Sequence, residues 1–378
     1  MRALTLACGL LLVCGSGGCG SGEGGGGGWP PDRFGPHQVG FRMLELWDAA
    51  RARPVTTALW YPAPRPGAGA VRANYLAILE GRAYEGVPAA VADGPFPLVM
   101  FSHGNQGVAV QSPSLCEHLA SQGFVVAAPT HAGNTIVDSP SAEEMAAAAL
   151  ARPLDVAFAL AETLAIGAEP GSDLHGLVDP DRLGVMGHSF GGYTTLVLAG
   201  GRVDVDAAQA RCAAGVPNDV FCPAIAHLPA GSTLARPDGL PRFAAALALA
   251  PGSWGAFGDD GLAGVDAPTL VMGGTHDEFT LQDTLPIYAG LPPPKALVDL
   301  EGAGHMAFTD LCRMELPVPE LQAMCDPATH LDMARGFELI HAFAARFLRS
   351  QLGGEPALAD GLAESPDWPE AHVEREGI

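Results

Sequence analysis

The chain has 378 residues, of which 42 are Asp or Glu and 20 are Lys or Arg, so its formal net charge is −22. Lys295 is the only lysine. So acidic a chain repels the phosphates of nucleic acid, and we expect no nucleic-acid partner. The length allows two domains, but α/β folds of this size often form one.

The N-terminal residues predict export. Arg2 is followed by an apolar run over residues 3–13 and then by small residues, a pattern typical of a secretory signal and too short to span a membrane as a helix. We assign residues 1–19 to a signal peptide and residues 20–37 to a glycine-rich linker. Cys19 is a candidate for a lipid anchor to the membrane, as in an outer-membrane or periplasmic lipoprotein. Because the leucine usual at the start of such a signal is missing, a free periplasmic or secreted protein is the alternative.

From residue 38 onward, short apolar runs alternate with helical stretches. The predicted helices include residues 142–166, where Pro153 predicts a kink or a break, and residues 333–348, where apolar side chains share one face. Such alternation predicts an α/β fold with one eight-stranded, mostly parallel sheet and helices on both faces. The expected strands lie at 41–47, 55–61, 98–101, 124–128, 183–186, 243–250, 269–272 and 296–300.

The loop at residues 102–107 follows one of these strands and reads Ser-His-Gly-Asn-Gln-Gly. Gly104 lets the backbone turn, so the N–H of Asn105 can point at a nucleophile on the neighbouring strand and act as an oxyanion donor. A plain turn role for Asn105 is the alternative.

The run Gly-His-Ser-Phe-Gly at residues 187–191 lies between an apolar stretch and a segment typical of a helix. This arrangement predicts a nucleophile elbow, a turn so tight that the residues flanking Ser189 must lack a Cβ and its hydroxyl stands clear of the sheet. The backbone N–H of Phe190 is then the first oxyanion donor. The alternative is a glycine-rich turn with an idle serine.

An acid and a base follow in the order that such an elbow requires. Asp277 comes after the strand at 269–272, and His305 lies in a glycine-rich loop after the last strand. We predict that His305 is the general base and Asp277 the group that orients it. Asp277 as a helix N-cap is an alternative, and Glu278 is the nearest rival acid. The rivals of His305 are His103, His131, His188 and His276.

Two close pairs of cysteines are expected to form disulfides, Cys212 with Cys222 and Cys312 with Cys325. Such bonds persist in an oxidising compartment, which agrees with export. No set of His or Cys residues has the spacing of a zinc site, so we expect neither a metal nor a cofactor.

Two segments stand apart from the regular alternation. Residues 201–242 form a long insertion after the elbow helix. Enzymes with a nucleophile elbow often place segments that cover the substrate at this position. Residues 353–378 form an acidic tail after the catalytic domain, which we assign to residues 38–352. We expect this tail to be loosely ordered.

The motifs together resemble one group of proteins. The loop at 102–104, the run Gly-His-Ser-Phe-Gly-Gly at 187–192 and Gly-Ala-Gly-His at 302–305 resemble the platelet-activating-factor acetylhydrolase and dienelactone-hydrolase-like branch of the α/β-hydrolases. Ala-Pro-Gly-Ser-Trp at 250–254 is similar to bacterial cutinases and polyester hydrolases. The resemblance covers residues 38–352 and implies an α/β-hydrolase fold and ester hydrolysis.

Two departures from these families matter. Dienelactone hydrolases carry a cysteine nucleophile, whereas this chain has Ser189. The acetylhydrolase places its acid after the sixth strand, but the strand at 243–250 ends here in Ala-Pro, so the acid moves to Asp277, as in cutinases. The resemblance therefore does not imply a phospholipid substrate. Trp254 is a candidate wall of the substrate pocket, with plain packing as the alternative.

We therefore predict an exported serine hydrolase that cleaves small or polymeric carboxylic esters through an acyl-enzyme on Ser189, like carboxylesterases, lipases and cutinases. A serine peptidase of the same fold would use the same three side chains, but the chain shows no added domain or acidic pair for gripping a peptide N-terminus. A non-catalytic binding protein on this fold is the other alternative, disfavoured because every chemical part is present in order.

Overall fold

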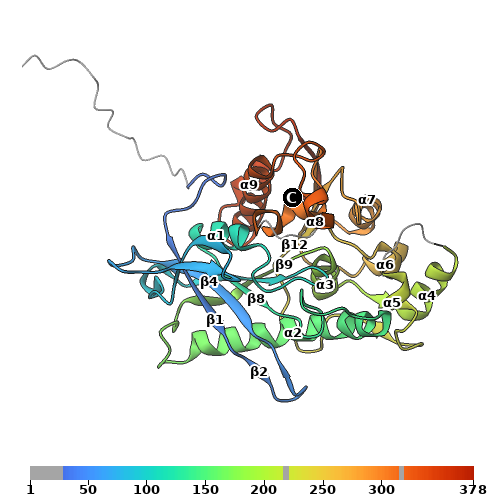
Figure 1. The fold of residues 1–378 in the computed structure, drawn as a ribbon, viewed down its shortest axis with the longest axis horizontal. Coiled ribbons are helices and arrows are strands. Elements are labelled where there is room, and N and C mark those ends of the chain that lie inside the picture. Colours follow the sequence, from blue (N-terminus) through green and yellow to red (C-terminus); the bar gives the residue numbers. More distant parts are fainter. Residues whose placement is uncertain (1–28, 216–220, 315–318) are drawn as a thin grey trace, which may run out of the picture.

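The computed structural model describes residues 29–215, 221–314 and 319–378 (Figure 1). The predicted signal peptide, the candidate lipid site Cys19 and the linker up to residue 28 lie outside the described residues.

A mixed sheet forms the centre of the molecule. In the described part of the chain it has 11 strands, in the order β15-β14-β13-β12-β9-β7-β8-β4-β1-β6-β5. Its middle is parallel, as predicted. The six parallel strands are β7 (Phe96–Ser102), β8 (Val125–Pro129), β9 (Val178–His188), β12 (Ala245–Leu249), β13 (Thr269–Gly274) and β14 (Lys295–Leu300).

The prediction of eight strands was too low. Each of the eight predicted runs overlaps a strand, including the outer strands β1 (Gln38–Leu44) and β4 (Thr57–Ala63). Three outer strands of the sheet were missed: β5 (Arg72–Tyr75), β6 (Leu79–Glu85) and β15 (Ala371–Glu376). These strands mix polar with apolar residues, and many of their side chains face solvent, so they lack the continuous apolar run that marks a buried parallel strand.

The acidic tail is ordered, contrary to the prediction. Strand β15 pairs antiparallel with β14 along all six of its residues. Before it, Leu362 is fully buried, and the Trp368 ring packs edge-on against Phe343 and beneath the guanidinium of Arg346. A few apolar side chains in a charged segment are enough to hold the tail against the domain.

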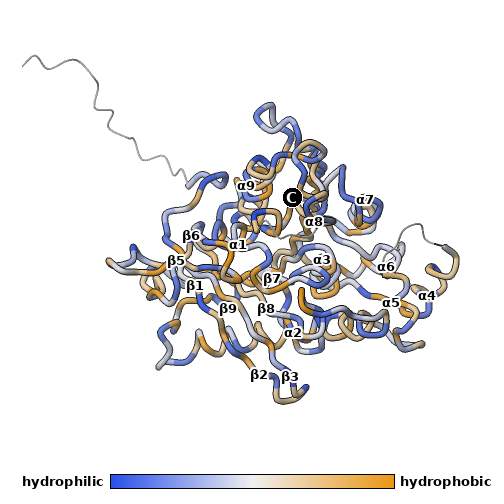
Figure 2. Tube along the Cα trace, viewed as in Figure 1, coloured by the Kyte–Doolittle hydropathy of each residue, from blue (hydrophilic) through white to orange (hydrophobic). Residues whose placement is uncertain are grey.

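Helices cover both faces of the sheet. Along β7, Leu98 and Met100 enter one hydrophobic core, and Val99 and Phe101 enter the other. The first core lies under α2 (Ala142–Ala168) and α3 (Phe190–Leu198), and the second under α1 (Pro113–Ser121) and α9 (Met333–Gln351). Figure 1 shows α2 along the lower side of the sheet and α1 and α9 above it. In Figure 2, hydrophobic and hydrophilic residues alternate along α2 and α9, as expected of helices with one buried face.

Helix α2 continues through Pro153 as one element, so the predicted break is absent there. Its start is fixed by a capping box, in which Ser141 accepts a hydrogen bond from the backbone of Glu144 and the Glu144 side chain accepts one in return.

The insertion at 201–242 forms a small subdomain beside α6 (Trp254–Gly261), visible at the right of Figure 1. It contains α4 (Val205–Ala213), α5 (Cys222–Ile225) and the strand pair β10 (Val203–Asp204) and β11 (Thr233–Leu234). The predicted disulfide between Cys212 and Cys222 joins α4 to α5. The remaining elements are β2 (Trp47–Asp48), β3 (Arg53–Pro54), α7 (Leu281–Gly290), α8 (Pro319–Met324) and the 3-10 helices η1 (Val91–Asp93), η2 (His305–Phe308), η3 (Leu311–Met314) and η4 (Pro356–Gly361).

Candidate active site

Ser189 occupies a strained turn between β9 and α3. Its backbone has φ 56° and ψ −116°, a region that non-glycine residues rarely adopt and that is associated with functional sites. Glycine is required on both sides of the turn. A Cβ on Gly191 would overlap the carbonyl oxygen of Ser102, and one on Gly187 would overlap that of Gly191. The geometry is that of a nucleophile elbow.

Asp277 and His305, predicted from separate loops, are hydrogen bonded. His305 Nδ1 lies 2.8 Å from Asp277 Oδ2, and both side chains are almost completely buried. Asp277 follows β13, and His305 begins η2 after β14. Because both parent strands are parallel, their carboxyl ends bring these loops to one edge of the sheet.

Further donors hold the Asp277 carboxylate. The backbone N–H groups of Phe279 and Thr280 donate to its Oδ1 at 2.8 and 2.7 Å, and the Thr280 hydroxyl donates to Oδ2 at 2.7 Å. Burial alone would raise the pKa of Asp277, but the hydrogen bonds from His305 and Thr280 outweigh it and lower this pKa to about 2. Asp277 therefore stays ionised and holds the proton of His305 on Nδ1, which leaves Nε2 able to accept a proton.

Ser189, His305 and Asn105 line one cavity of about 240 Å³. Within the described residues, no hydrogen bond joins the Ser189 hydroxyl to His305, and in free enzymes such a bond often tightens only when substrate binds. The apolar part of the lining comes from residues that the sequence did not single out, namely Met145, Phe221, Phe279, Met306 and Leu311. No local pattern marks them, because they come from four separate stretches of the chain, with Met306 and Leu311 in the same one.

Two backbone N–H groups are available beside Ser189. Phe190 is the first residue of α3, and the first N–H groups of a helix have no partner within it. Asn105 is exposed at the cavity, and no acceptor in the described chain takes its N–H. These are the two donors that the sequence predicted for an oxyanion.

A buried arginine holds the loop that carries Asn105. Arg152, on α2, donates to the carbonyl oxygens of His103 and Gly104 at 2.5 and 2.8 Å, and to Asn134 Oδ1 at 2.6 Å. Asn134 in turn donates to the Asn105 side chain at 2.8 Å. Burial lowers the pKa of Arg152 to about 9. This role was not predicted, although an arginine within the alanine-rich stretch at 142–166 is an available signal.

A chain of hydrogen bonds runs along the wall of the cavity and joins three loops. The N–H of Gly104 donates to Gln111 Oε1 at 3.0 Å, and Gln111 Nε2 donates to His188 Nδ1 at 3.0 Å. His188 Nε2 donates to the carbonyl oxygen of His305 at 3.1 Å. Since that carbonyl can only accept, the His188 proton is on Nε2. Burial, together with the nearby His305, lowers the pKa of His188 to about 3, so this histidine is neutral. We call Gly104, Gln111, His188 and His305 the bridging chain.

A second Ser-His-Asp arrangement lies in the core. Ser102 Oγ is 2.9 Å from His131 Nε2, and His131 Nδ1 is 3.0 Å from Asp155 Oδ2. All three side chains are at most 1% exposed, and none lines a cavity described in this structure. Arg51 and Arg53 also bind Asp155. With Ser102 fully buried, this arrangement ties β7, β8 and α2 together.

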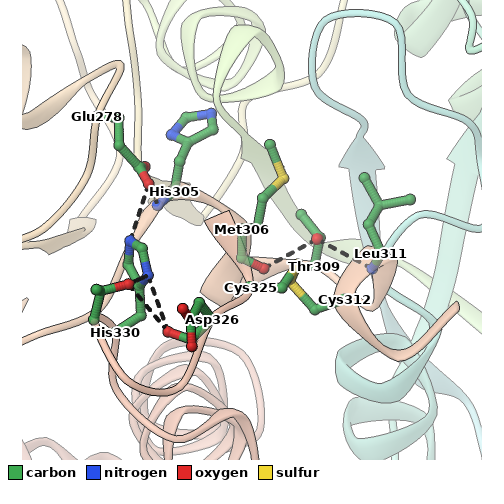
Figure 3. Close-up of a disulfide and its surroundings, with 10 residues drawn as sticks. Glu278, His305, Met306, Thr309, Leu311, Cys312, Cys325, Asp326 and His330 are labelled. Atoms are coloured by element: carbon green, nitrogen blue, oxygen red, sulfur yellow. Dashed lines mark hydrogen bonds and ion pairs between the residues drawn. A yellow bond between two sulfur atoms is a disulfide. The ribbon is translucent and has the colours of Figure 1, made fainter. Parts of the chain in front are cut away.

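The rival residues are engaged elsewhere. Glu278 pairs with His330 at 3.0 Å and accepts only a long bond from the backbone of His305 (Figure 3). His276 binds the carbonyl oxygen of Thr329. His103 Nε2 accepts the backbone N–H of His131.

Trp254 does not line the cavity that contains Ser189 and is half-buried at the start of α6, packed against the first core. The predicted disulfide between Cys312 and Cys325 is present. Figure 3 shows this bond beside Leu311 and Met306, two residues of the cavity wall.

Comparison with known proteins agrees with the fold. A solved ferulic acid esterase from Streptomyces cinnamoneus superimposes with a TM-score of 0.61 at 23% sequence identity, over 92% of this chain and 98% of that one. The chain has the α/β-hydrolase fold. The chlorophyllase family model matches residues 87–216 of the chain.

Two curated relatives match about half of the chain. Cutinase est2 of Thermobifida alba is 29% identical over 214 residues, which is 55% of this chain and 52% of that protein. A bis(hydroxyethyl) terephthalate hydrolase of Streptomyces coelicolor is 29% identical over 224 residues, which is 58% of this chain and 54% of that protein. The chain thus spans about half the length of these relatives, and its predicted similarity to cutinases and polyester hydrolases is confirmed.

Proposed function

We propose that this α/β-hydrolase is an exported carboxylic-ester hydrolase that forms an acyl-enzyme on Ser189. One observation carries the proposal: the buried Asp277–His305 pair opens through His305 onto the cavity that Ser189 also lines. The similarity to a cutinase and a terephthalate-ester hydrolase supports esters, rather than peptides, as substrates.

The mechanism follows from these positions. His305 Nε2 takes the proton of Ser189 Oγ, which attacks the ester carbonyl, and the N–H groups of Phe190 and Asn105 hold the negative oxygen. When the C–O bond of the ester breaks, the departing alcohol takes the proton from His305. Water then gives a proton to His305 and attacks the acyl group, Ser189 Oγ is released and takes that proton back, and the carboxylic acid leaves.

The test is hydrolysis of p-nitrophenyl butyrate by the purified protein and by Ser189→Ala. We expect the substitution to lower kcat by at least about 10⁴-fold with an unchanged circular dichroism spectrum, because the attacking atom is lost. The matched control is Ser102→Ala in the buried arrangement, which should lower the melting temperature and keep hydrolysis. Loss of activity only in Ser102→Ala would contradict the proposal.

The substrate range is tested by measuring hydrolysis of a panel of substrates. We propose that the cavity takes esters of aliphatic or aromatic acids, and the panel is p-nitrophenyl esters from acetate to palmitate, bis(hydroxyethyl) terephthalate and a polyester film. Peptide p-nitroanilides serve as the comparison. Cleavage of the peptides without the esters would favour the peptidase alternative.

Export is supported by the two disulfides, which an oxidising compartment maintains. Among the described residues, no helix is long and apolar enough to cross a membrane. Attachment through Cys19 is a separate proposal. It predicts incorporation of labelled palmitate by cells expressing the full chain, and loss of that label in Cys19→Ala.

A further inference from the structure

A second, smaller cavity lies next to the catalytic one, enclosed by α2, α3, α5 and α6. Its volume is about 20 Å³, which is room for a group the size of one water molecule. Its walls are almost entirely apolar and include Ala224 and Leu228 from the insertion. We call it the inner pocket.

The inner pocket and the catalytic cavity share two wall residues, Met145 and Phe221. Phe221 is 6% exposed, and its ring packs on that of Phe190, with 4.9 Å between the ring centroids. Phe190 directly follows the nucleophile and also lines the inner pocket. The partition between the two spaces therefore stands next to the atoms that would hold an acyl group.

Two hydroxyl groups without hydrogen-bond partners among the described residues distinguish the inner pocket from an ordinary packing void in the hydrophobic core. Tyr193 and Ser253 line it, are at most 2% exposed, and have no hydrogen-bond partner for Tyr193 Oη or Ser253 Oγ in the described chain. Buried hydroxyls without partners cost free energy, and native cores rarely contain them. Their place at a cavity beside the nucleophile suits a space that a bound molecule enters.

We infer that the inner pocket is an extension of the acyl-binding site, and that Phe221 limits how far an acyl chain reaches into it. This inference rests on the proposed function. With Phe221 in place, the 240 Å³ catalytic cavity takes short acyl groups. When that ring is displaced or removed, the two spaces join, and the far end of a medium-length apolar chain enters the pocket under the insertion.

The experiment compares kcat/KM for p-nitrophenyl octanoate and p-nitrophenyl butyrate, as a ratio, in the full-length protein and in Phe221→Ala. Burial of one methylene is worth about fourfold in affinity, so two methylenes in the inner pocket raise the octanoate-to-butyrate ratio about 15-fold. Phe221→Leu opens the partition less and should give a smaller increase. It also keeps the test available if the alanine variant does not fold.

Two control variants test whether the rise in the octanoate-to-butyrate ratio comes from the inner pocket. In Phe221→Ala/Ala224→Leu, the new side chain refills the inner pocket, and the ratio should return towards the wild-type value. In Phe279→Ala, the cavity is widened on the His305 side, where the Phe279 ring lies 5.2 Å from the imidazole, and both esters should change by a similar factor.

The possible outcomes separate this inference from the proposed function. If the wild-type protein cleaves neither ester, the proposed function fails. If it cleaves butyrate and the ratio stays unchanged in folded Phe221→Ala and Phe221→Leu, the inference alone is overturned. A gain that survives Ala224→Leu overturns it as well, because the extra chain would then lie elsewhere.

Discussion

The Asp277 carboxylate accepts hydrogen bonds from the His305 ring, from the Thr280 hydroxyl and from two backbone N–H groups. So many donors fix one rotamer of the acid and, through it, one tautomer of His305. A substitution that keeps the shape of Asp277 and removes its charge should therefore leave the fold intact. It should, however, shift the proton of His305 from Nδ1 to Nε2.

For Asp277→Asn we expect kcat for p-nitrophenyl butyrate to fall by about 10³–10⁴-fold, because the amide favours the wrong tautomer of His305. Glu278→Gln is the matched control, since Glu278 contacts His330 rather than the His305 ring, and its kcat should change less than about tenfold. Equal losses in the two variants would remove Asp277 from its proposed role.

The sequence singles out Ser189, Asp277 and His305 because each follows a recognisable strand and their order along the chain is informative. In the structure Asp277 contacts His305, and His305 and Ser189 line one cavity, while their catalytic roles stay a prediction. The sequence does not single out Arg152 or Gln111, whose partners lie in other segments and become neighbours only in the fold. For Trp254 the sequence left a pocket wall and plain packing open, and the side chain packs against the first core, outside the cavity lining.

At the scale of elements, the bridging chain joins the loop of Asn105, the turn of Ser189 and the loop of His305. Each loop follows a different parallel strand. Strand pairing alone therefore still allows small shifts of the three loops relative to one another. Gln111, which is 2% exposed, holds two of these loops together. Its amide nitrogen donates to His188, and its amide oxygen accepts from the backbone of Gly104.

For Gln111→Met, which keeps the length and removes both hydrogen bonds, we expect kcat to fall about 10–100-fold while KM changes less than about threefold. The matched control is Gln209→Met on α4, which also loses two hydrogen bonds, to Ile225 and Leu228, at a distance from the nucleophile. A Gln111 variant that lowers only the melting temperature would show that the amide has no part in positioning.

The strands that were not predicted lie in the outer parts of the sheet. The central parallel strands are apolar on both faces and were all predicted, whereas β6, with alternating buried and exposed residues, and β15, with its charged residues, were not. Strand β15 forms because β14 offers it a free edge, which is a property of the sheet and is invisible in residues 371–376 alone.

At the scale of the whole molecule, the protein buries many neutral histidines. Burial lowers the pKa of His118 to about 4 and of His188 to about 3, and lowers it well below 6.5 for His103, His131 and His341. Unfolding lets these groups return to a pKa near 6.5, so below that pH the unfolded chain binds more protons than the native one. Stability is then full above about pH 6.5 and is lost as the pH falls towards the native pKa values.

His341 gives a direct test. Its Nε2 has no hydrogen-bond partner in the described chain, and its ring stacks on those of His118 and Phe337. We expect His341→Phe to raise the unfolding free energy by about 2 kcal/mol more at pH 5 than at pH 8, because only the wild-type unfolded chain gains that proton. Urea unfolding at the two pH values measures this difference, and exposed His175→Phe is the control, with no such change expected. An equal effect of His341→Phe at both pH values would refute the linkage.

The most direct measurement for the account is the site at which a fluorophosphonate reacts with the folded protein. The reagent modifies an activated serine, and Arg182 and Arg202 bound a tryptic segment that contains Ser189 and excludes Ser102. We predict one adduct, on Ser189, and none after Ser189→Ala or in protein unfolded beforehand. An adduct on Ser102, or no adduct at all on folded protein, would contradict the claim that Ser189 is the nucleophile.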